Sequence, residues 1–252
     1  MSDVITDIQD GVIIVTINRP EAKNAMNKAA AEGIHAAMQQ LDEDASLNAA
    51  ILTGAGGTFC SGMDLKGFLK GESPIVKGHG FGGITEKGPE KPLIAAIEGY
   101  ALAGGMELAI ACDLRVANSK AQFGIPEVKR SLVAAAGGLL ALPDIIGKGM
   151  AMELALTGEF IDAQRAYEVG FVNRLTDGDA LEEAMKLAAL VAANGPLALK
   201  ATKKIVNEQS DWDSETMWKN QGKIVAPVFA SSDAREGAAA FAEKRKPVWK
   251  GE

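Results

Sequence analysis

The sequence has few of the residues from which disulfide frameworks and metal sites are built. Only two cysteines, Cys60 and Cys112, and two histidines, His35 and His79, occur in 252 residues. Two cysteines in a long chain are no disulfide framework, so we expect reduced thiols and a cytoplasmic protein. Neither histidine has a partner at metal-ligand spacing, which argues against a histidine-based metal site or a catalytic triad.

Long hydrophobic runs and an excess of basic charge are also missing. The longest apolar runs, such as residues 12–17, are far too short to span a bilayer. Residues 1–10 carry acids and no basic segment, so we expect no secretory signal. The net charge of −7 would repel a phosphate backbone. We therefore expect neither a membrane nor a nucleic acid as a partner.

What is present is an ordinary globular composition with an aliphatic core. Hydrophobic residues make up 47% of the chain and charged residues 23%, while aromatic residues are only 5%. The length suits one large domain, or one domain with a small appendage. A folded chain of this size buries roughly seven-tenths of its extended surface, so the hydrophobic core can be stable without disulfide bonds.

The first half of the chain alternates between strand and helix patterns. β-Branched or apolar runs at 11–17, 49–53, 92–97 and 113–117 predict strands. Between the first two, residues 27–41 repeat apolar side chains at helical spacing after Asn27, a good capping residue. This alternation favours an α/β fold with a largely parallel sheet covered on both faces.

The second half reads as helical. We expect helices near 136–142, 148–156, 178–193, 196–209, 215–229 and 233–245, with Asp162, Asp179, Asp213 and Ser232 as candidate N-caps. We divide the chain into an α/β core, 1–195, and a C-terminal helical part, 196–252. Between the halves, residues 67–90 hold seven glycines without periodicity, which favours a mobile loop that is either a lid or plain disorder.

The most distinctive segment joins a buried strand to a short apolar helix through Ala103-Gly104-Gly105. Glycines at a helix start leave the backbone N–H groups unshielded, so these groups can donate hydrogen bonds to a ligand beyond the helix end. Glu107, in the first turn, places a carboxylate beside those donors. The alternative is a pair of packing glycines with a glutamate that complements the helix dipole. The segment alone does not decide between them.

A second glutamate follows twenty residues later. Glu127 comes directly after Pro126, in a largely apolar stretch that is long enough to return the chain to the first glutamate. Two carboxyl groups can divide general-base and general-acid roles if their surroundings separate their pKa values. The alternative for Glu127 is a surface acid at a helix start.

A third segment, residues 58–65, follows the glycines that end the second strand. It could place the backbone N–H of Met63 opposite that of Gly104, and two convergent N–H groups form an oxyanion hole. We expect Asp64 to cap the following turn rather than to act as a catalytic acid.

These segments resemble the enoyl-CoA hydratase/isomerase family, also called the crotonase family. The resemblance extends over nearly the whole chain, at residues 17–20, 24–26, 59–65, 94–113, 122–127, 156–158 and 241–246. It implies an α/β crotonase-type fold of repeated ββα units, with a helical C-terminal part used in trimerisation. It also implies a homotrimer, or a hexamer made of two trimers.

The resemblance further implies the function of the site. The N–H groups of Met63 and Gly104 would bind the thioester carbonyl of an acyl-CoA substrate. Glu107 would activate water and Glu127 would handle the α-proton, as in the hydratases. No metal or redox cofactor is implied, because coenzyme A is part of the substrate. The residues implied in substrate and CoA binding are Ala22, Lys23, Asn24, Ser61, Asp64, Leu65, Gly105, Phe241 and Lys244.

Some features depart from the family pattern or stay open. Met63 stands where the family commonly has alanine, and Leu140 and Ala141 replace a more polar pair, which leaves the acyl group undetermined. An enoyl-CoA isomerase and a non-catalytic acyl-CoA-binding protein remain alternatives to a hydratase. Lys244 and its basic neighbours could also be a solvated helix end.

Overall fold

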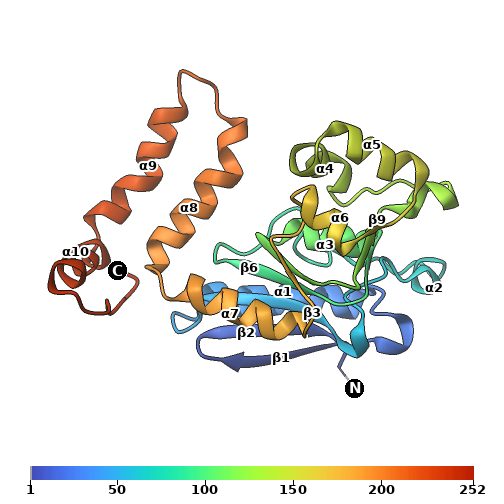
Figure 1. Cartoon of the computed structure of the whole chain (residues 1–252), viewed down its shortest axis with the longest axis horizontal. Coiled ribbons are helices and arrows are strands. Elements are labelled where there is room, and N and C mark those ends of the chain that lie inside the picture. The colour runs from blue at the N-terminus through green and yellow to red at the C-terminus, as the bar shows by residue number, and fades with distance from the viewer. Residues whose placement is uncertain (1) are drawn as a thin grey trace.

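The computed structural model describes residues 2–252, and its centre is a six-stranded sheet (Figure 1). Strand β1 pairs antiparallel with β2, and every other pairing in this sheet is parallel. The predicted strands are confirmed, whereas β1, whose residues are mostly exposed, had not been expected. The strands, in spatial order, are β1 (Val4–Gln9), β2 (Val12–Ile17), β3 (Ala49–Gly54), β6 (Leu93–Ile97), β8 (Leu114–Asn118) and β11 (Arg174–Thr176).

One helix covers each face of this sheet. Helix α1 (Lys28–Glu43) begins after Asn27, whose side chain accepts a hydrogen bond from the N–H of Ala30, as the capping prediction required. Its apolar side chains pack in the main core on one face. Helix α7 (Ala180–Ala192) lies on the other face and buries alanines four residues apart.

A second, three-stranded sheet places the candidate site. Strand β7 (Tyr100–Leu102) pairs parallel with β9 (Gln122–Gly124), which pairs antiparallel with β10 (Ile161–Asp162). Helix α3 (Gly104–Ala111) follows β7, and the 3-10 helix η3 (Pro126–Arg130) follows β9. Because β7 and β9 are parallel neighbours, α3 and η3 begin at the same edge of the sheet.

The glycine-rich segment differs from the mobile loop that the sequence suggested. It begins within α2 (Leu65–Phe68) and contains a two-stranded ribbon of β4 (Ile75–Val76) and β5 (Gly80–Phe81). Phe81 and Ile84 are buried in the main core. The lid interpretation is therefore wrong for the second half of the segment, because its apolar side chains pack on the core.

The C-terminal helices α8 (Pro196–Glu208), α9 (Met217–Ala230) and α10 (Ser232–Glu243) extend away from the sheet (Figure 1). All six predicted helices of the second half are found. The remaining elements are η1 (Pro20–Ala22), η2 (Ala55–Gly57), α4 (Gly138–Ile146), α5 (Lys148–Thr157), α6 (Ala163–Glu168) and η4 (Gln209–Asp211). The division at 195/196 coincides with the start of α8 and stays a prediction about domains.

Two of the four predicted N-caps are confirmed and two are wrong. Asp162 and Asp179 accept hydrogen bonds from the first turns of α6 and α7. Asp213 instead closes the turn that precedes α9, and the cap of α10 is Ser231, one residue before the predicted Ser232.

Candidate active site

Glu107 is held inside the protein at the first turn of α3. Its residue surface is 3% exposed. Its Oε1 accepts hydrogen bonds from the N–H groups of Ala136 (2.7 Å) and Gly138 (3.0 Å). Burial raises the pKa of the carboxyl, and the two N–H donors oppose that shift. The chain therefore fixes one oxygen of this carboxyl group with backbone donors.

Glu127 is placed by Pro126 at the first turn of η3, with different surroundings. Its Oε2 is buried and has no hydrogen-bond partner within residues 2–252. Burial raises the pKa of Glu127 to about 7, and the charge of Glu107 adds to the shift. The two carboxyl groups thus share one site, but only Glu107 is held by backbone N–H groups from the start of α4.

The first residue of α3 presents a free backbone amide beside these glutamates. Ala103 precedes the helix with φ 53° and ψ −130°, a conformation that side chains rarely adopt. Within residues 2–252, the N–H of Gly104 donates no hydrogen bond to the protein. The Phe81 ring packs so closely on Gly104 that a Cβ there would lie 2.5 Å from the ring.

The Met63 amide is oriented by a short β-bridge with Met26. The N–H of Met26 donates to Gly62 O (2.7 Å), and the N–H of Asp64 donates to Met26 O (2.9 Å). Because N–H groups alternate in direction along an extended chain, the N–H of Met63 points away from Met26. Nothing within the described residues 2–252 accepts a hydrogen bond from it.

The two free amides belong to segments in direct contact. Gly62 has φ +107°, and a Cβ there would lie 2.8 Å from the Cβ of Ala103 and 3.4 Å from the nitrogen of Gly104. Only glycine therefore allows this turn to approach the start of α3. Two amides without protein acceptors at such an approach suit an oxygen atom that carries developing negative charge.

Residues 7–252 match the family described as Enoyl-CoA hydratase/isomerase. The chain belongs to the enoyl-CoA hydratase/isomerase family. It is 40% identical to enoyl-CoA hydratase EchA19 of Mycobacterium tuberculosis over 97% of this chain and 95% of that protein. It is 34% identical to the short-chain-enoyl-CoA hydratase of Clostridium acetobutylicum, over 98% and 97% of the two chains.

A solved structure of this family agrees with the whole architecture. The crystal structure of enoyl-CoA hydratase EchA1 from Mycobacterium marinum superposes with a TM-score of 0.98 at 55% identity, and each chain is covered completely. The predicted crotonase-type α/β fold with a helical C-terminal part is thereby confirmed.

Four of the residues that the family resemblance implied in CoA binding, Ala22, Lys23, Ser61 and Leu65, lie on neighbouring loops next to the Met63 amide. Ala22 ends η1, and the N–H of Ser61 donates to Lys23 O (3.1 Å), so the two loops run side by side. Lys23 places its ammonium group 5.1 Å from the centre of the Tyr100 ring. Leu65, at the start of α2, is 42% exposed.

Asn24, Asp64 and Gly105 have structural contacts of their own. The buried Asn24 side chain donates to Ala55 O (2.8 Å) and Thr58 O (2.5 Å), and its N–H donates to Arg19 O (2.9 Å), so Asn24 holds this loop in place and is not exposed to a substrate. Asp64 caps α2, as predicted. A Cβ at Gly105 would lie 2.0 Å from Cys60 O, so glycine lets α3 pack on that loop.

Phe241 and Lys244 lie far from the glutamates in the single chain. Both belong to the α10 end of the C-terminal helices, across the molecule from α3 (Figure 1). Phe241 is 88% exposed, and Lys244 caps α10 in a left-handed conformation. One chain therefore does not bring these two residues to the candidate site.

Three contributors to the site were not found from the sequence. The amides of Ala136 and Gly138 hold Glu107, and the Gly137-Gly138 pair was the available signal for them. Phe81, which packs on Gly104, was missed because this contact joins segments distant in sequence. Within residues 2–252, no group of three or more metal-ligating side chains is present, and no helix has the length and apolar character to cross a membrane.

Proposed function

We propose that this protein is an enoyl-CoA hydratase, which adds water reversibly to a 2-trans-enoyl-CoA to give a 3-hydroxyacyl-CoA. The observation that carries the proposal is the pair of glutamates with unlike surroundings, Glu107 and Glu127, beside two free backbone amides. The names of the two curated relatives agree with this reaction.

The surroundings of the two carboxyl groups suit two different proton transfers. Burial raises the pKa of Glu107, which strengthens it as a base, and two N–H donors fix its Oε1, so it accepts a proton from the attacking water. Glu127, with a pKa of about 7, is substantially protonated at neutral pH and delivers a proton to the α-carbon. Together they add the two parts of water across the double bond.

The amides of Met63 and Gly104 form the oxyanion hole in this proposal. Attack of water at the β-carbon moves negative charge onto the thioester oxygen, and the N–H groups stabilise the resulting enolate. A single donor of this kind typically lowers the barrier by about 2.7–4 kcal/mol. The N-terminal end of the α3 dipole acts in the same direction.

The substrate supplies coenzyme A, and the proposed reaction uses no metal or redox cofactor. Ala22 and Lys23 would meet the nucleotide, with Ser61 and Leu65 beside the pantetheine, and the buried Asn24 would hold the loop that carries Lys23. Exposed aromatic side chains on the C-terminal helices, Trp218 (71%), Phe229 (79%) and Phe241 (88%), support burial against other copies of the chain. We propose a homotrimer or a dimer of trimers, in which Phe241 and Lys244 reach a neighbouring site.

An isomerase is the second candidate, and the second glutamate argues against it. Double-bond migration needs one base that moves a proton between two carbons, so a second carboxyl group in the site would have no function. An assay that compares 2-enoyl-CoA and 3-enoyl-CoA thioesters separates the two reactions.

The test is turnover across a panel of 2-trans-enoyl-CoA thioesters of increasing chain length. Loss of the ultraviolet absorbance of the conjugated thioester reports hydration. We expect turnover of at least one member and slower or no turnover of the 3-enoyl isomers. Turnover of 3-enoyl thioesters alone would indicate an isomerase, and binding without turnover would indicate an acyl-CoA-binding protein.

A further inference from the structure

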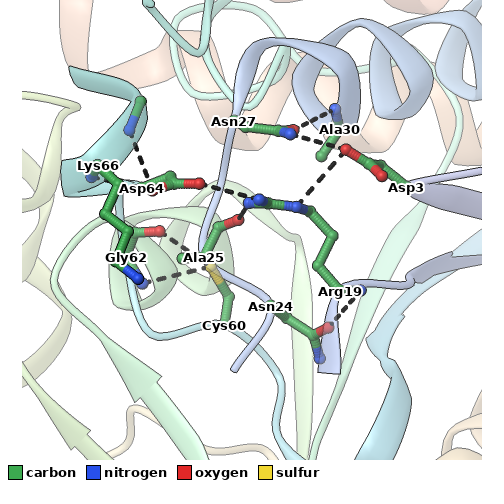
Figure 2. Close-up of polar contacts among 11 residues, drawn as sticks. Asp3, Arg19, Asn24, Ala25, Asn27, Ala30, Cys60, Gly62, Asp64 and Lys66 are labelled. Atoms are coloured by element: carbon green, nitrogen blue, oxygen red, sulfur yellow. Dashed lines mark hydrogen bonds and ion pairs between the residues drawn. The ribbon is translucent and has the colours of Figure 1, made fainter. Parts of the chain in front are cut away.

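The sequence predicted no role for Arg19. It is buried beside residues 58–65, the segment that carries the Met63 amide. It follows β2, and its side chain is only 14% exposed. Its guanidinium meets three separate segments of the chain (Figure 2). Nη2 donates to Asp64 Oδ2 (2.9 Å), Nη1 donates to Ala25 O, and Nε lies 3.5 Å from Asp3 Oδ2.

Two of these contacts lie on opposite strands of the bridge that orients Met63. Ala25 precedes Met26 on one strand, and Asp64 follows Met63 on the other. Arg19 therefore holds both strands of the bridge at once. A sliding or a rotation of either strand would turn the N–H of Met63 away from the site, and it would also break a contact with the guanidinium.

Asp64 connects this contact to α2. While its Oδ2 pairs with Arg19, its Oδ1 accepts from the N–H groups of Lys66 (3.0 Å) and Gly67 (3.2 Å). The hydrogen bond from Arg19 lowers the pKa of Asp64, so the carboxylate is charged at neutral pH. The residue after Met63 is thus fixed from both sides, by a cation and by a helix start.

We propose that Arg19 is a positioning residue, which sets the direction of the Met63 amide in the oxyanion hole by joining Ala25 to Asp64. The inference rests on the proposed hydratase function. It requires arginine in particular, because a planar guanidinium can bind a carboxylate and a carbonyl with separate nitrogens, whereas a lysine ammonium is a single point charge.

The test compares Arg19→Lys with the natural protein in ligand binding and turnover. Acetoacetyl-CoA, whose enolate resembles the transition state, probes the oxyanion hole, and butyryl-CoA probes ordinary acyl-CoA binding. We expect Arg19→Lys to weaken acetoacetyl-CoA binding and to lower kcat by about 10- to 100-fold, the range for a misplaced catalytic donor. Butyryl-CoA binding should change by less than about threefold, since uniform binding is retained.

A matched control separates positioning from stability. Lys203→Met removes an ion pair with Asp113 of similar burial, with side chains 15% and 24% exposed against 14% and 19% for Arg19 and Asp64. We expect a similar loss of thermal stability from this control, with kcat unchanged. If Arg19→Lys does not fold, Asp64→Asn is used in its place. Asparagine can still cap α2 but has no charge to pair with Arg19, and the binding of acetoacetyl-CoA and butyryl-CoA is compared in the same way.

Two results would overturn the proposal. One is an equal loss of affinity for both ligands, and the other is unchanged kcat with only the stability loss of the Lys203 control. If the natural protein hydrates no enoyl-CoA, the hydratase function fails, yet the comparison of acetoacetyl-CoA with butyryl-CoA still reports on the Met63 amide.

Discussion

Glu107 and Glu127 differ in what surrounds their oxygens, and that difference supports the roles proposed for them. Oε1 of Glu107 is bound by two backbone amides, whereas Oε2 of Glu127 is buried without a partner in residues 2–252. A carboxylate held by N–H donors is a directed base, and a buried carboxyl with a raised pKa is a proton donor at neutral pH.

Glu107→Gln and Glu127→Gln should each lower kcat by at least about 10²-fold, because each removes one proton transfer. Glutamine is nearly isosteric with glutamate, so the fold and acyl-CoA binding should change little. Steady-state kinetics with a 2-enoyl-CoA and calorimetric binding of a saturated acyl-CoA measure the two effects. If only one substitution affected hydration, the division of roles between the glutamates would be wrong.

The pH profile of kcat/KM should follow the pair of glutamates. Hydration needs Glu127 protonated and Glu107 ionised, so kcat/KM should fall about tenfold per pH unit above pH 7, where Glu127 loses its proton. It should also fall on the acid side, where Glu107, whose pKa is raised by burial, takes up a proton. Adding water to a double bond consumes no net proton, so the equilibrium constant does not vary with pH. The dehydration reaction should therefore show the same fall.

Initial rates measured in both directions between pH 6 and 9 test this expectation. A profile that stays flat across this range would contradict a proton donor with a pKa near 7. Because the ratio of kcat/KM in the two directions equals the equilibrium constant at every pH, the dehydration profile also checks the consistency of the measurement.

At the scale of elements, short strands and helix starts place the site. Strands β7 and β9 are three residues each, yet their parallel pairing sets α3 beside η3. Helix α7 packs on the other face of the large sheet, so we expect it to contribute to stability and not to catalysis. Substitution of its N-cap, Asp179, tests whether α7 affects stability without affecting catalysis.

Asp179→Ala should lower the free energy of unfolding by about 0.5–2 kcal/mol, because the N–H groups of Leu181 and Glu182 lose their acceptor. Asp179→Asn keeps an acceptor at this position and should cost only a few tenths. Urea unfolding at one protomer concentration measures both variants. A change in kcat for either variant would contradict the separation of α7 from the site.

The long elements could be predicted from the sequence because their side-chain patterns repeat over several residues. The strands near 11–17 and 49–53 and the helix after Asn27 all appear as expected. Strands β7, β9 and β10 are too short to show an alternating pattern, and β1 is an edge strand with mostly exposed side chains. The glutamates were found through local motifs and a family resemblance.

The contacts of Arg19 could not be predicted in this way. They join residues 3, 25 and 64, and no local pattern encodes which distant groups a buried guanidinium meets. The packing of Phe81 on Gly104 was missed for the same reason. Glycine content alone suggested a mobile loop, although several of these glycines allow close packing.

At the scale of the whole molecule, the C-terminal helices leave several large apolar side chains exposed in the single chain. The indole N–H of Trp249 donates to Ala193 O (2.9 Å), which fastens the chain end near the start of α8. Phe241 nevertheless stays almost fully exposed on α10. Other copies of the chain are the expected cover for this surface.

Truncation after Ser231 should dissociate the oligomer and weaken CoA binding together, because it removes α10 with Phe241 and Lys244. Light scattering gives the mass of each form, and calorimetry with coenzyme A gives the affinity. Phe241→Ala in the full chain is the milder variant and should weaken CoA binding while the helix remains. A natural protein that is a stable, fully active monomer would contradict the proposed assembly.

Isotope incorporation tests the proposed hydratase most directly. The protein is incubated with a 2-trans-enoyl-CoA in water enriched in both ¹⁸O and deuterium, and the products are analysed by mass spectrometry. A hydratase gives a 3-hydroxyacyl-CoA with ¹⁸O at the β-carbon and deuterium at the α-carbon. Deuterium without ¹⁸O, or an unchanged thioester, would contradict the addition of water by Glu107 and Glu127.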